Sequence, residues 1–156
     1  MTNNIVIIDY GVGNILSIKN AISFNGFNSI VTNDPEKIKK ASHIILPGVG
    51  AYPSAINKLK KMNLIEPIKE AKENNSYILG ICLGMQLLFS SSEEFEFTEG
   101  LNLIEGKITK LKSKNNNLNL KLPNIGWRCL EEKFQDQNLN ILKDIPTDSK
   151  FYFVHS

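Results

Sequence analysis

Short apolar runs alternate with amphipathic segments from the start of the chain to about residue 90. The apolar runs are rich in isoleucine, valine and leucine, and they predict buried strands over residues 4–9, 28–31, 43–46 and 77–81. Between them, apolar residues recur at helical spacing, which predicts helices over residues 14–25, from residue 34 onward, over 53–62 and over 64–74. Such alternation indicates a parallel sheet covered by helices, with ligands at the carboxyl ends of the strands.

Residues that favour helix ends stand at several of the predicted boundaries. Asn14 can cap the first helix, and Asn25 with Gly26 can end it. Asp34 followed by Pro35 suits a cap and the first turn of the second helix. These local signals support the boundaries that the apolar spacing predicts.

The pattern changes past Gly100, where short segments are separated by turn-rich stretches. This change predicts a strand-rich, antiparallel C-terminal part, with strands over residues 106–111, 127–130 and 151–155. The polar residues 113–121 include three consecutive asparagines and predict an exposed hairpin tip or loop. Because the sequence shows no internal repeat and no clear linker, residues 1–156 are interpreted as a single domain.

Composition is that of an ordinary soluble globular protein, with 42% hydrophobic and 22% charged residues. The net charge is only +2, and it argues against nucleic acid or an anionic membrane as a partner. The longest apolar run is too short to span a bilayer, and the N-terminus has no leader pattern, so we expect a cytoplasmic protein. The two cysteines fit no metal or disulfide spacing, and no cofactor is predicted.

Cys82 stands between the fourth predicted strand and a helical segment at residues 85–89, with Gly80 and Gly84 on either side. This arrangement is typical of a nucleophile elbow, a strained strand-to-helix turn that holds a nucleophile over the sheet. A thiolate at the start of a helix also faces unpaired N–H groups, which favour a negative charge. The alternative is a cysteine packed in the core, which is the interpretation we adopt for Cys129.

A Pro-Gly-Val-Gly loop at residues 47–50 follows the third predicted strand. Attack on a carboxamide places negative charge on its oxygen, and main-chain N–H groups can stabilise that charge. Two glycines allow a peptide to turn its N–H toward the site, because residues with a Cβ resist that conformation. The motif alone is also consistent with a plain strand-to-helix turn, so its value lies in the combination with Cys82.

Six short motifs stand one after another along the chain. They are Asp-Tyr-Gly-Val-Gly-Asn at residues 9–14, Leu-Pro-Gly-Val-Gly at 46–50, Leu-Gly-Ile-Cys-Leu-Gly-Met-Gln-Leu-Leu-Phe at 79–89, Ser-Glu-Glu at 92–94, Pro-Asn-Ile-Gly-Trp at 123–127 and Tyr-Phe-Val-His-Ser at 152–156. Together they closely resemble the glutaminase subunits of imidazole glycerol phosphate synthase, which are class I glutamine amidotransferases. Most of that class carry a Pro-Gly-Gly type of loop, so Pro-Gly-Val-Gly points to this subunit. The resemblance implies a flavodoxin-like α/β fold, with a mostly parallel sheet flanked by helices.

The resemblance also implies the chemistry and the roles of individual residues. Glutamine would be hydrolysed through a thioester on Cys82, and ammonia would pass to a separate cyclase subunit, the heterodimer partner. That subunit forms imidazole glycerol phosphate and an aminoimidazole carboxamide ribotide in histidine biosynthesis. The matched positions are Val49, Gly50 and Leu83 in the oxyanion hole, Gln86, Glu94, His155 and Ser156 around glutamine, and Asn14, Trp127 and Tyr152 near the partner interface. A core role for Trp127 and a solvated charge for Glu94 are the alternatives.

A cysteine amidase needs a base to form the thiolate and an acid to protonate the leaving ammonia. His43 starts a predicted strand and is interpreted as structural, while His155 matches a substrate-binding position. In the family, the catalytic histidine and glutamate lie in a His-Pro-Glu segment, and these 156 residues do not contain it. We therefore expect a domain that is incomplete at its C-terminus, with negligible glutaminase activity from residues 1–156 alone.

Other functions share some of these features. A paralogous glutaminase could feed ammonia to a different synthase, for example one that aminates a sugar. A non-catalytic fragment could keep the fold and dock on a partner. A generic cysteine hydrolase of the same fold is disfavoured by the Pro-Gly-Val-Gly loop together with Gln86.

Overall fold

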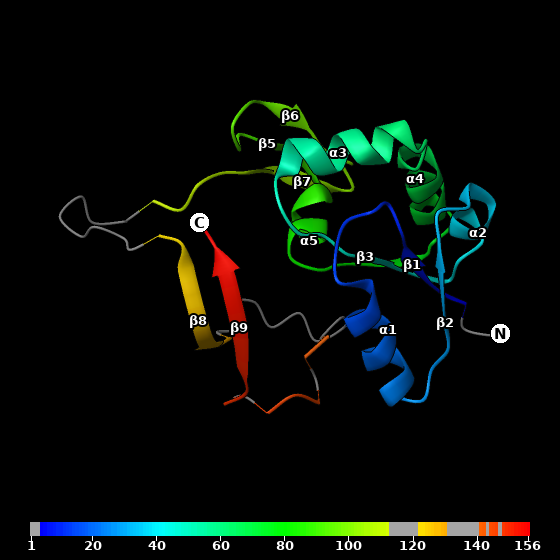
Figure 1. Cartoon of the computed structure of the whole chain (residues 1–156), viewed down its shortest axis with the longest axis horizontal. Coiled ribbons are helices and arrows are strands. Elements are labelled where there is room, and N and C mark those ends of the chain that lie inside the picture. The colour runs from blue at the N-terminus through cyan, green and yellow to red at the C-terminus, as the bar shows by residue number, and fades with distance from the viewer. Residues whose placement is uncertain (1–3, 113–121, 131–140, 143, 147) are drawn as a thin grey trace. The chain divides into compact units, whose positions relative to one another are not determined.

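The computed structural model describes residues 4–112, 122–130, 141–142, 144–146 and 148–156 (Figure 1). The loop expected at residues 113–121 lies outside this part of the chain. The protein divides into two compact units, Met1–Thr109 and Lys110–Ser156, and each is described by itself. None of the described helices has the length and apolar character that a membrane crossing requires.

The first unit is built on a parallel four-stranded sheet with the strand order β2-β1-β3-β4. Its strands are β1 (Ile5–Ile8), β2 (Ser29–Thr32), β3 (His43–Leu46) and β4 (Tyr77–Gly80). All four were predicted from the apolar runs. Because β3 lies between β1 and β4 and all three run in parallel, the loops that follow them leave the same edge of the sheet.

Helices connect the strands, and the first two begin where the capping residues indicate. They are α1 (Ile15–Phe24), α2 (Pro35–Lys39), α3 (Tyr52–Lys61), α4 (Ile65–Glu73) and α5 (Leu83–Leu87). Asn14 caps α1, since its Oδ1 accepts the N–H of Ser17 at 3.2 Å. Asp34 caps α2 by accepting the N–H of Glu36 at 3.0 Å. Both predicted caps are confirmed.

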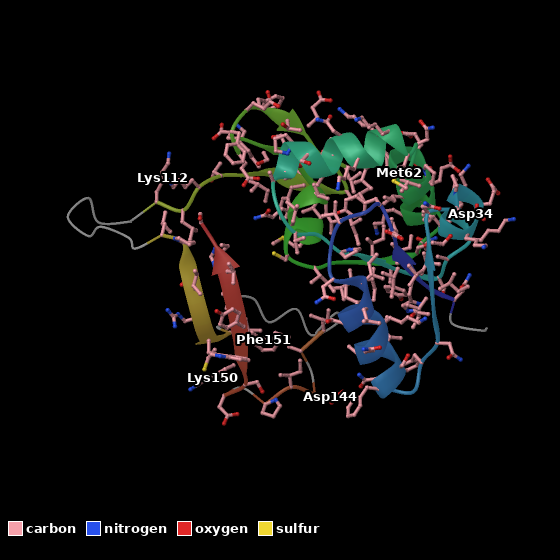
Figure 2. The ribbon with its side chains drawn as sticks, in the orientation of Figure 1. Asp34, Met62, Lys112, Asp144, Lys150 and Phe151 are labelled. Carbon is pink, nitrogen blue, oxygen red and sulfur yellow. The ribbon has the colours of Figure 1, made fainter. Side chains whose placement is uncertain are left out.

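The hydrophobic core lies between one face of the sheet and helices α2 to α5. Val6 and Ile8 of β1 belong to it, because alternate residues of a strand face the same side. The helices contribute Ile38, Ile56, Leu59, Ile68, Leu83 and Leu87. Met62, the residue after α3, packs against this core (Figure 2). Figure 1 shows α1 across the sheet from α3 and α4, and α1 buries none of its residues.

A small second sheet of the first unit differs from expectation in two respects. It has the order β6-β5-β7, formed by β5 (Phe89–Ser92), β6 (Thr98–Glu99) and β7 (Ile104–Ile108). Phe89, predicted to be helical, starts β5, because the Leu88 carbonyl already accepts N–H groups from Leu103 at 2.8 Å and Ile104 at 3.0 Å. The strand expected over residues 106–111 lies instead at residues 104–108 as β7, and it pairs with β5 in parallel, whereas an antiparallel arrangement was predicted.

The second unit contains an antiparallel strand pair, as predicted for the C-terminal part. The strands are β8 (Asn124–Cys129) and β9 (Lys150–His155), and Lys150 and Phe151 at the start of β9 are labelled in Figure 2. Cys129 was interpreted as a packed residue, and this interpretation is wrong. Its side chain is exposed at the end of β8, where Sγ lies 3.8 Å from the Asp148 carbonyl oxygen.

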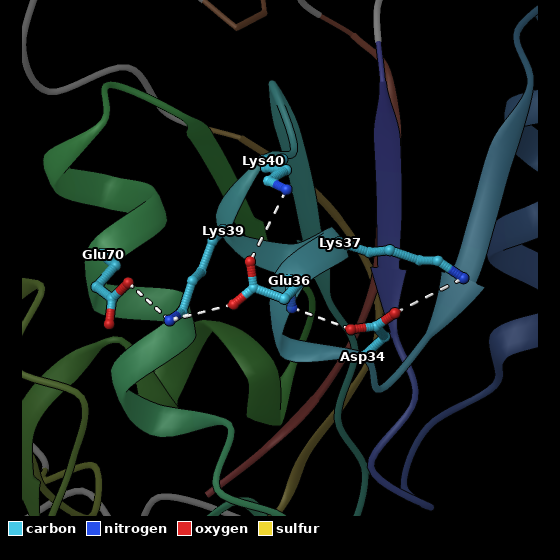
Figure 3. Close-up of polar contacts among 6 residues, drawn as sticks. All are labelled: Asp34, Glu36, Lys37, Lys39, Lys40 and Glu70. Carbon is cyan, nitrogen blue, oxygen red and sulfur yellow. Dashed lines mark hydrogen bonds and ion pairs between the residues drawn. The ribbon is translucent and has the colours of Figure 1, made fainter.

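Charged side chains link α2 to α4 at the surface of the first unit (Figure 3). Lys39 Nζ lies 3.0 Å from Glu70 Oε2 and 3.6 Å from Glu36 Oε1, and Lys40 Nζ lies 3.8 Å from Glu36 Oε2. The hydrogen bond with Glu70 raises the pKa of Lys39 above its usual value of 10.5. The cluster therefore favours the charged lysine in the folded protein.

Replacing Lys39 with methionine is expected to lower the free energy of unfolding at neutral pH by a small amount. A lysine whose pKa is raised by folding contributes stability below its usual pKa of 10.5, and this contribution is lost as the pH rises through the raised value. Salt should also shrink the difference, because the pair is partly exposed. Urea unfolding at low and high salt measures the effect, with Lys61→Met on α3 as the control. Identical midpoints for Lys39→Met and the wild type at low salt would contradict it.

Candidate active site

Cys82 occupies a strained turn between β4 and α5. Its backbone angles are φ +54° and ψ −118°, which residues other than glycine rarely adopt. Such strain persists only where the surrounding structure imposes it. The Cys82 side chain is exposed, so the alternative of a cysteine packed in the core does not describe it. The backbone geometry is that of a nucleophile elbow.

Glycines allow the elbow to lie against its neighbours. A Cβ at Gly80 would lie 2.5 Å from the Met85 nitrogen, and a Cβ at Gly84 would collide with the Leu46 carbonyl oxygen. The same Leu46 carbonyl accepts the N–H of Ile81 at 3.0 Å. Contact between α5 and the end of β3 is thus backbone to backbone, and it leaves no room for a side chain at Gly84.

The Pro-Gly-Val-Gly loop leaves the end of β3 and packs against the elbow. A Cβ at Gly48 would lie 2.8 Å from the Leu83 Cβ. Pro47 and Gly48 are buried, whereas Val49 is 56% exposed. Gly50 has φ +94°, and apart from its chain neighbours no described residue has an atom within 4 Å of the position its Cβ would take. The first half of the loop is therefore fixed, and the second half lies open at the surface.

Main-chain N–H groups at the start of α5 adjoin Cys82. The Cys82 carbonyl accepts the N–H groups of Met85 at 3.0 Å and Gln86 at 3.3 Å. Leu83 is the first residue of the helix, so its N–H has no acceptor within the helix. An exposed thiol beside a main-chain donor and a glycine-containing loop can carry out acyl transfer through a tetrahedral intermediate. Gln86 follows on α5 and is half-buried.

Glu94 is held where the Pro-Gly-Val-Gly loop runs into α3. Its Oε2 accepts the main-chain N–H of Tyr52 at 2.7 Å, and its own N–H donates to Ser92 Oγ at 3.1 Å. A carboxylate at the first turn of a helix is favoured by the unpaired N–H groups there. The contact with Tyr52 was not predicted, because these residues are 42 positions apart and meet only through the fold.

The loop after β1 approaches the same edge of the sheet. The buried hydroxyl of Tyr10 donates to the Pro47 carbonyl at 2.6 Å, a contact that the motifs did not reveal. Only the adjacency of β1 and β3 could have indicated it. Asn14, matched to the partner interface, is exposed at the start of α1.

The remaining matched residues belong to the second unit. Trp127 of β8 and Tyr152 of β9 are opposite each other, with ring centroids 5.4 Å apart in an edge-to-face arrangement, and both are more than half exposed. His155 Nε2 lies 2.9 Å from Asn124 Nδ2, and Ser156 is exposed. Within the described ranges, no group of three or more His, Cys, Asp or Glu side chains is placed to hold a metal ion.

His43 was interpreted as structural, and its contacts fit that role. It is the first residue of β3, its Nδ1 lies 3.0 Å from Ser42 Oγ, and its ring stacks on Tyr77 at a centroid distance of 5.2 Å. Both rings lie at the amino ends of β3 and β4, whereas Cys82 follows the carboxyl end of β4. His43 is therefore at the opposite end of the sheet from the elbow.

An elbow cysteine and a glycine loop at the carboxyl edge of a parallel sheet are the arrangement of an acyl-transfer enzyme with a cysteine nucleophile. The family model described as glutamine amidotransferase class-I matches residues 6–156, and the chain belongs to this family. A solved structure titled as a glutamine amidotransferase has the same fold, with a TM-score of 0.56 at 17% identity. The similarity covers 65% of this chain and 54%, or about half, of that chain.

The relatives narrow this membership to the HisH subunits of imidazole glycerol phosphate synthase. The chain is 46% identical over 154 residues to the synthase subunit HisH 2 of Vibrio vulnificus, covering 97% of this chain and 69% of that one. It is 46% identical over 153 residues to HisH 2 of Methanococcus maripaludis, covering 97% and 72%. HisH of Sulfurimonas denitrificans is 41% identical over 152 residues, again covering 97% and 72%.

Proposed function

We propose that this protein hydrolyses glutamine to glutamate and ammonia, as the glutaminase subunit of imidazole glycerol phosphate synthase in histidine biosynthesis. The observation that carries the proposal is the strained, exposed Cys82 at an elbow packed against the Pro-Gly-Val-Gly loop. The HisH relatives, which match nearly the whole chain, support the assignment to this synthase. The family match over residues 6–156 also supports the interpretation that both units belong to one amidotransferase domain.

The proposed reaction is an acyl transfer from nitrogen to sulfur. Cys82 Sγ forms a bond to the side-chain carbonyl carbon of glutamine, and the carbonyl electron pair moves onto oxygen. The peptide N–H groups of Gly50 and Leu83 stabilise that negative charge. When the tetrahedral intermediate collapses, the C–N bond breaks and the thiol proton, carried by a general base, leaves with ammonia. Water then hydrolyses the thioester to glutamate and restores the thiol.

The substrate's amino-acid end is assigned by motif matching to Gln86, Glu94, His155 and Ser156. The bond from Tyr52 N–H to Glu94 Oε2 supports a role for Glu94, because it fixes a carboxylate where the loop enters α3. We propose that Glu94 Oε1 receives the α-ammonium group of glutamine. A charge-assisted hydrogen bond of this kind is stronger than a neutral one.

Ammonia made at Cys82 is proposed to pass to a cyclase subunit bound as a heterodimer partner. The relatives are named as subunits of a synthase, so a partner subunit is expected. Asn14, Trp127 and Tyr152 are proposed to lie near that interface, and their exposure supports this. We place the reaction in the cytoplasm, with glutamine as substrate and no role for nucleic acid or membrane.

Glu94→Gln is expected to raise the KM for glutamine by about 10- to 100-fold while changing kcat little. The amide side chain introduced at position 94 can still accept the Tyr52 N–H through its carbonyl oxygen, but it lacks the negative charge that pairs with the α-ammonium group of the substrate. Steady-state glutamate release by the natural full-length protein with its partner measures both constants. Glu96→Gln, at another exposed carboxylate, is the control. A KM equal to the wild type in Glu94→Gln would remove Glu94 from the substrate site.

Complementation tests the pathway assignment separately. The natural full-length gene is expected to restore growth of a histidine auxotroph that lacks its own HisH, provided that the cognate cyclase gene is supplied. Cys82→Ala should not restore growth. If the wild-type gene fails although the purified protein releases glutamate, the protein serves a different synthase.

A further inference from the structure

Tyr10 connects the end of β1 to the root of the Pro-Gly-Val-Gly loop. Its side chain is 1% exposed, and its hydroxyl donates a 2.6 Å hydrogen bond to the carbonyl oxygen of Pro47. Pro47 is itself buried, so water cannot easily replace this donor. When a buried carbonyl loses its hydrogen-bond donor, the folded protein is destabilised by the full cost of desolvating that carbonyl.

The loop that follows Tyr10 adds two contacts in the same region. A Cβ at Gly13 would lie 2.7 Å from the Pro47 Cβ and 3.3 Å from the Gly48 nitrogen. The backbone of the loop after β1 therefore packs directly against the Pro47 ring of the Pro-Gly-Val-Gly loop. The Gly11 carbonyl accepts a 3.0 Å hydrogen bond from Lys58 Nζ of α3. The loop after β1 is thus held from α3 on one side and rests on Pro47 on the other.

The position of this bond decides what it can control. The Pro47 carbonyl and the Gly48 N–H belong to one rigid peptide plane, so a bond to the carbonyl fixes the direction in which the loop continues. Beyond that plane, Val49 is 56% exposed and Gly50 has open space around it. The fixed root therefore sets where the peptide before Gly50 can lie relative to Cys82.

Burial raises the pKa of the Tyr10 hydroxyl well above its usual value of 10.0. The hydroxyl therefore keeps its proton throughout the neutral and mildly alkaline range, and it stays a donor to Pro47. Tyr52 is equally buried, but its hydroxyl atom has no hydrogen-bond partner among the described residues. The two tyrosines thus differ in the hydrogen bond and match in burial.

We propose that Tyr10 is a positioning residue for oxyanion stabilisation and that it acts through the Pro47 carbonyl. Lys58 assists by holding the carbonyl of the adjoining Gly11. This inference rests on the proposed function, because it assumes that the Pro-Gly-Val-Gly loop faces the intermediate formed on Cys82. In this role Tyr10 itself touches no reacting atom. Its loss should therefore weaken binding of a charged or oxyanion-like intermediate more than it weakens binding of glutamine.

The aldehyde analogue of glutamine provides the test. Cys82 Sγ adds to its carbonyl carbon, the carbonyl electrons move to oxygen, and the thiol proton completes a hemithioacetal whose oxygen occupies the oxyanion position. In the natural full-length protein with its partner, Tyr10→Phe is expected to weaken aldehyde inhibition and to lower kcat by about 10-fold or more. The KM for glutamine and the rate of alkylation of Cys82 by iodoacetamide should change less than about twofold, because neither uses the oxyanion donors.

Two further variants keep the experiment decisive. Tyr52→Phe removes a buried hydroxyl that makes no hydrogen bond within the part of the chain that the structure describes, and it should leave aldehyde inhibition unchanged. Lys58→Met removes the hydrogen bond to the Gly11 carbonyl but changes only an exposed side chain. It should weaken aldehyde inhibition, as Tyr10→Phe does, and it provides the test if Tyr10→Phe does not fold.

Each outcome has a distinct meaning. Wild-type inhibition by the aldehyde in both Tyr10→Phe and Lys58→Met would overturn the role of Tyr10 and leave the proposed function intact. An equal loss of aldehyde inhibition and iodoacetamide alkylation would also overturn it, because the elbow itself would then be disturbed. If the aldehyde does not modify Cys82 in the wild type, the proposed function fails first.

Discussion

Replacing Cys82 with alanine is expected to abolish glutamine hydrolysis, lowering kcat by at least about 10³-fold in the natural full-length protein with its partner. Without the thiol no thioester can form, and the remaining N–H donors have only a weak nucleophile, water, to assist. Glutamate release measured with and without the partner's ligand gives the effect. Cys129→Ala is the matched control, because that thiol is also exposed but belongs to a strand rather than an elbow.

Replacing Cys82 with glycine should raise stability although it removes activity. Cys82 has φ +54°, so Cys82→Gly is expected to raise the free energy of unfolding by about 1 kcal/mol while removing activity. Urea unfolding of Cys82→Gly and Cys82→Ala separates relief of strain from loss of the side chain. If Cys82→Gly is less stable than Cys82→Ala, the turn is not strained in the way that its backbone angles indicate.

Gly84→Ala is expected to cost about 3 kcal/mol or more of stability and to inactivate the enzyme. The added Cβ would collide with the Leu46 carbonyl oxygen, a backbone atom that cannot move without displacing β3. The elbow and the Pro-Gly-Val-Gly loop would then separate. Urea unfolding gives the change in stability, and alkylation of Cys82 by iodoacetamide reports the geometry of the elbow.

Gly26→Ala is the control that measures the cost of losing a glycine at positive φ without any steric collision. Gly26 has φ +80° with open space around it, so alanine there should cost only about 1 kcal/mol. Gly84 lies outside the positive-φ glycines, so its cost is steric. A Gly84→Ala protein as stable as Gly26→Ala would contradict the packing of the elbow against β3.

The parallel sheet and its helices could be predicted because local signals and the fold agree in the first unit. Apolar runs gave β1 to β4, and the side chains of Asn14 and Asp34 cap the helices that follow them. Prediction failed where partners come from distant segments. Phe89 continues an apolar helical pattern, but the Leu88 carbonyl bonds to residues 103 and 104, so the chain leaves the helix for β5.

The site divides in the same way. Glycines on both sides of Cys82 mark the elbow in the sequence, and Cys82 has the strained backbone that such a turn requires. In the structure Gly48, Gly80 and Gly84 allow close packing, whereas Gly50 has φ +94°. The contacts of Tyr10 with Pro47 and of Glu94 with Tyr52 join segments 37 and 42 residues apart. No periodicity or spacing reveals such pairs before the strand order is known. Cys129 was misjudged because a strand position does not determine which face is covered.

Selective labelling with a glutamine analogue distinguishes a nucleophilic Cys82 from an ordinary exposed thiol. The natural full-length protein with its partner is treated with the diazoketone analogue of glutamine, and the modification of each cysteine is followed by peptide mass spectrometry. We expect Cys82 to react at least about 100-fold faster than Cys129, with glutamine slowing its reaction, because Cys82 stands at the elbow where glutamine is proposed to bind, whereas Cys129 belongs to a strand. Equal rates at the two cysteines, unaffected by glutamine, would contradict the nucleophilic role of Cys82.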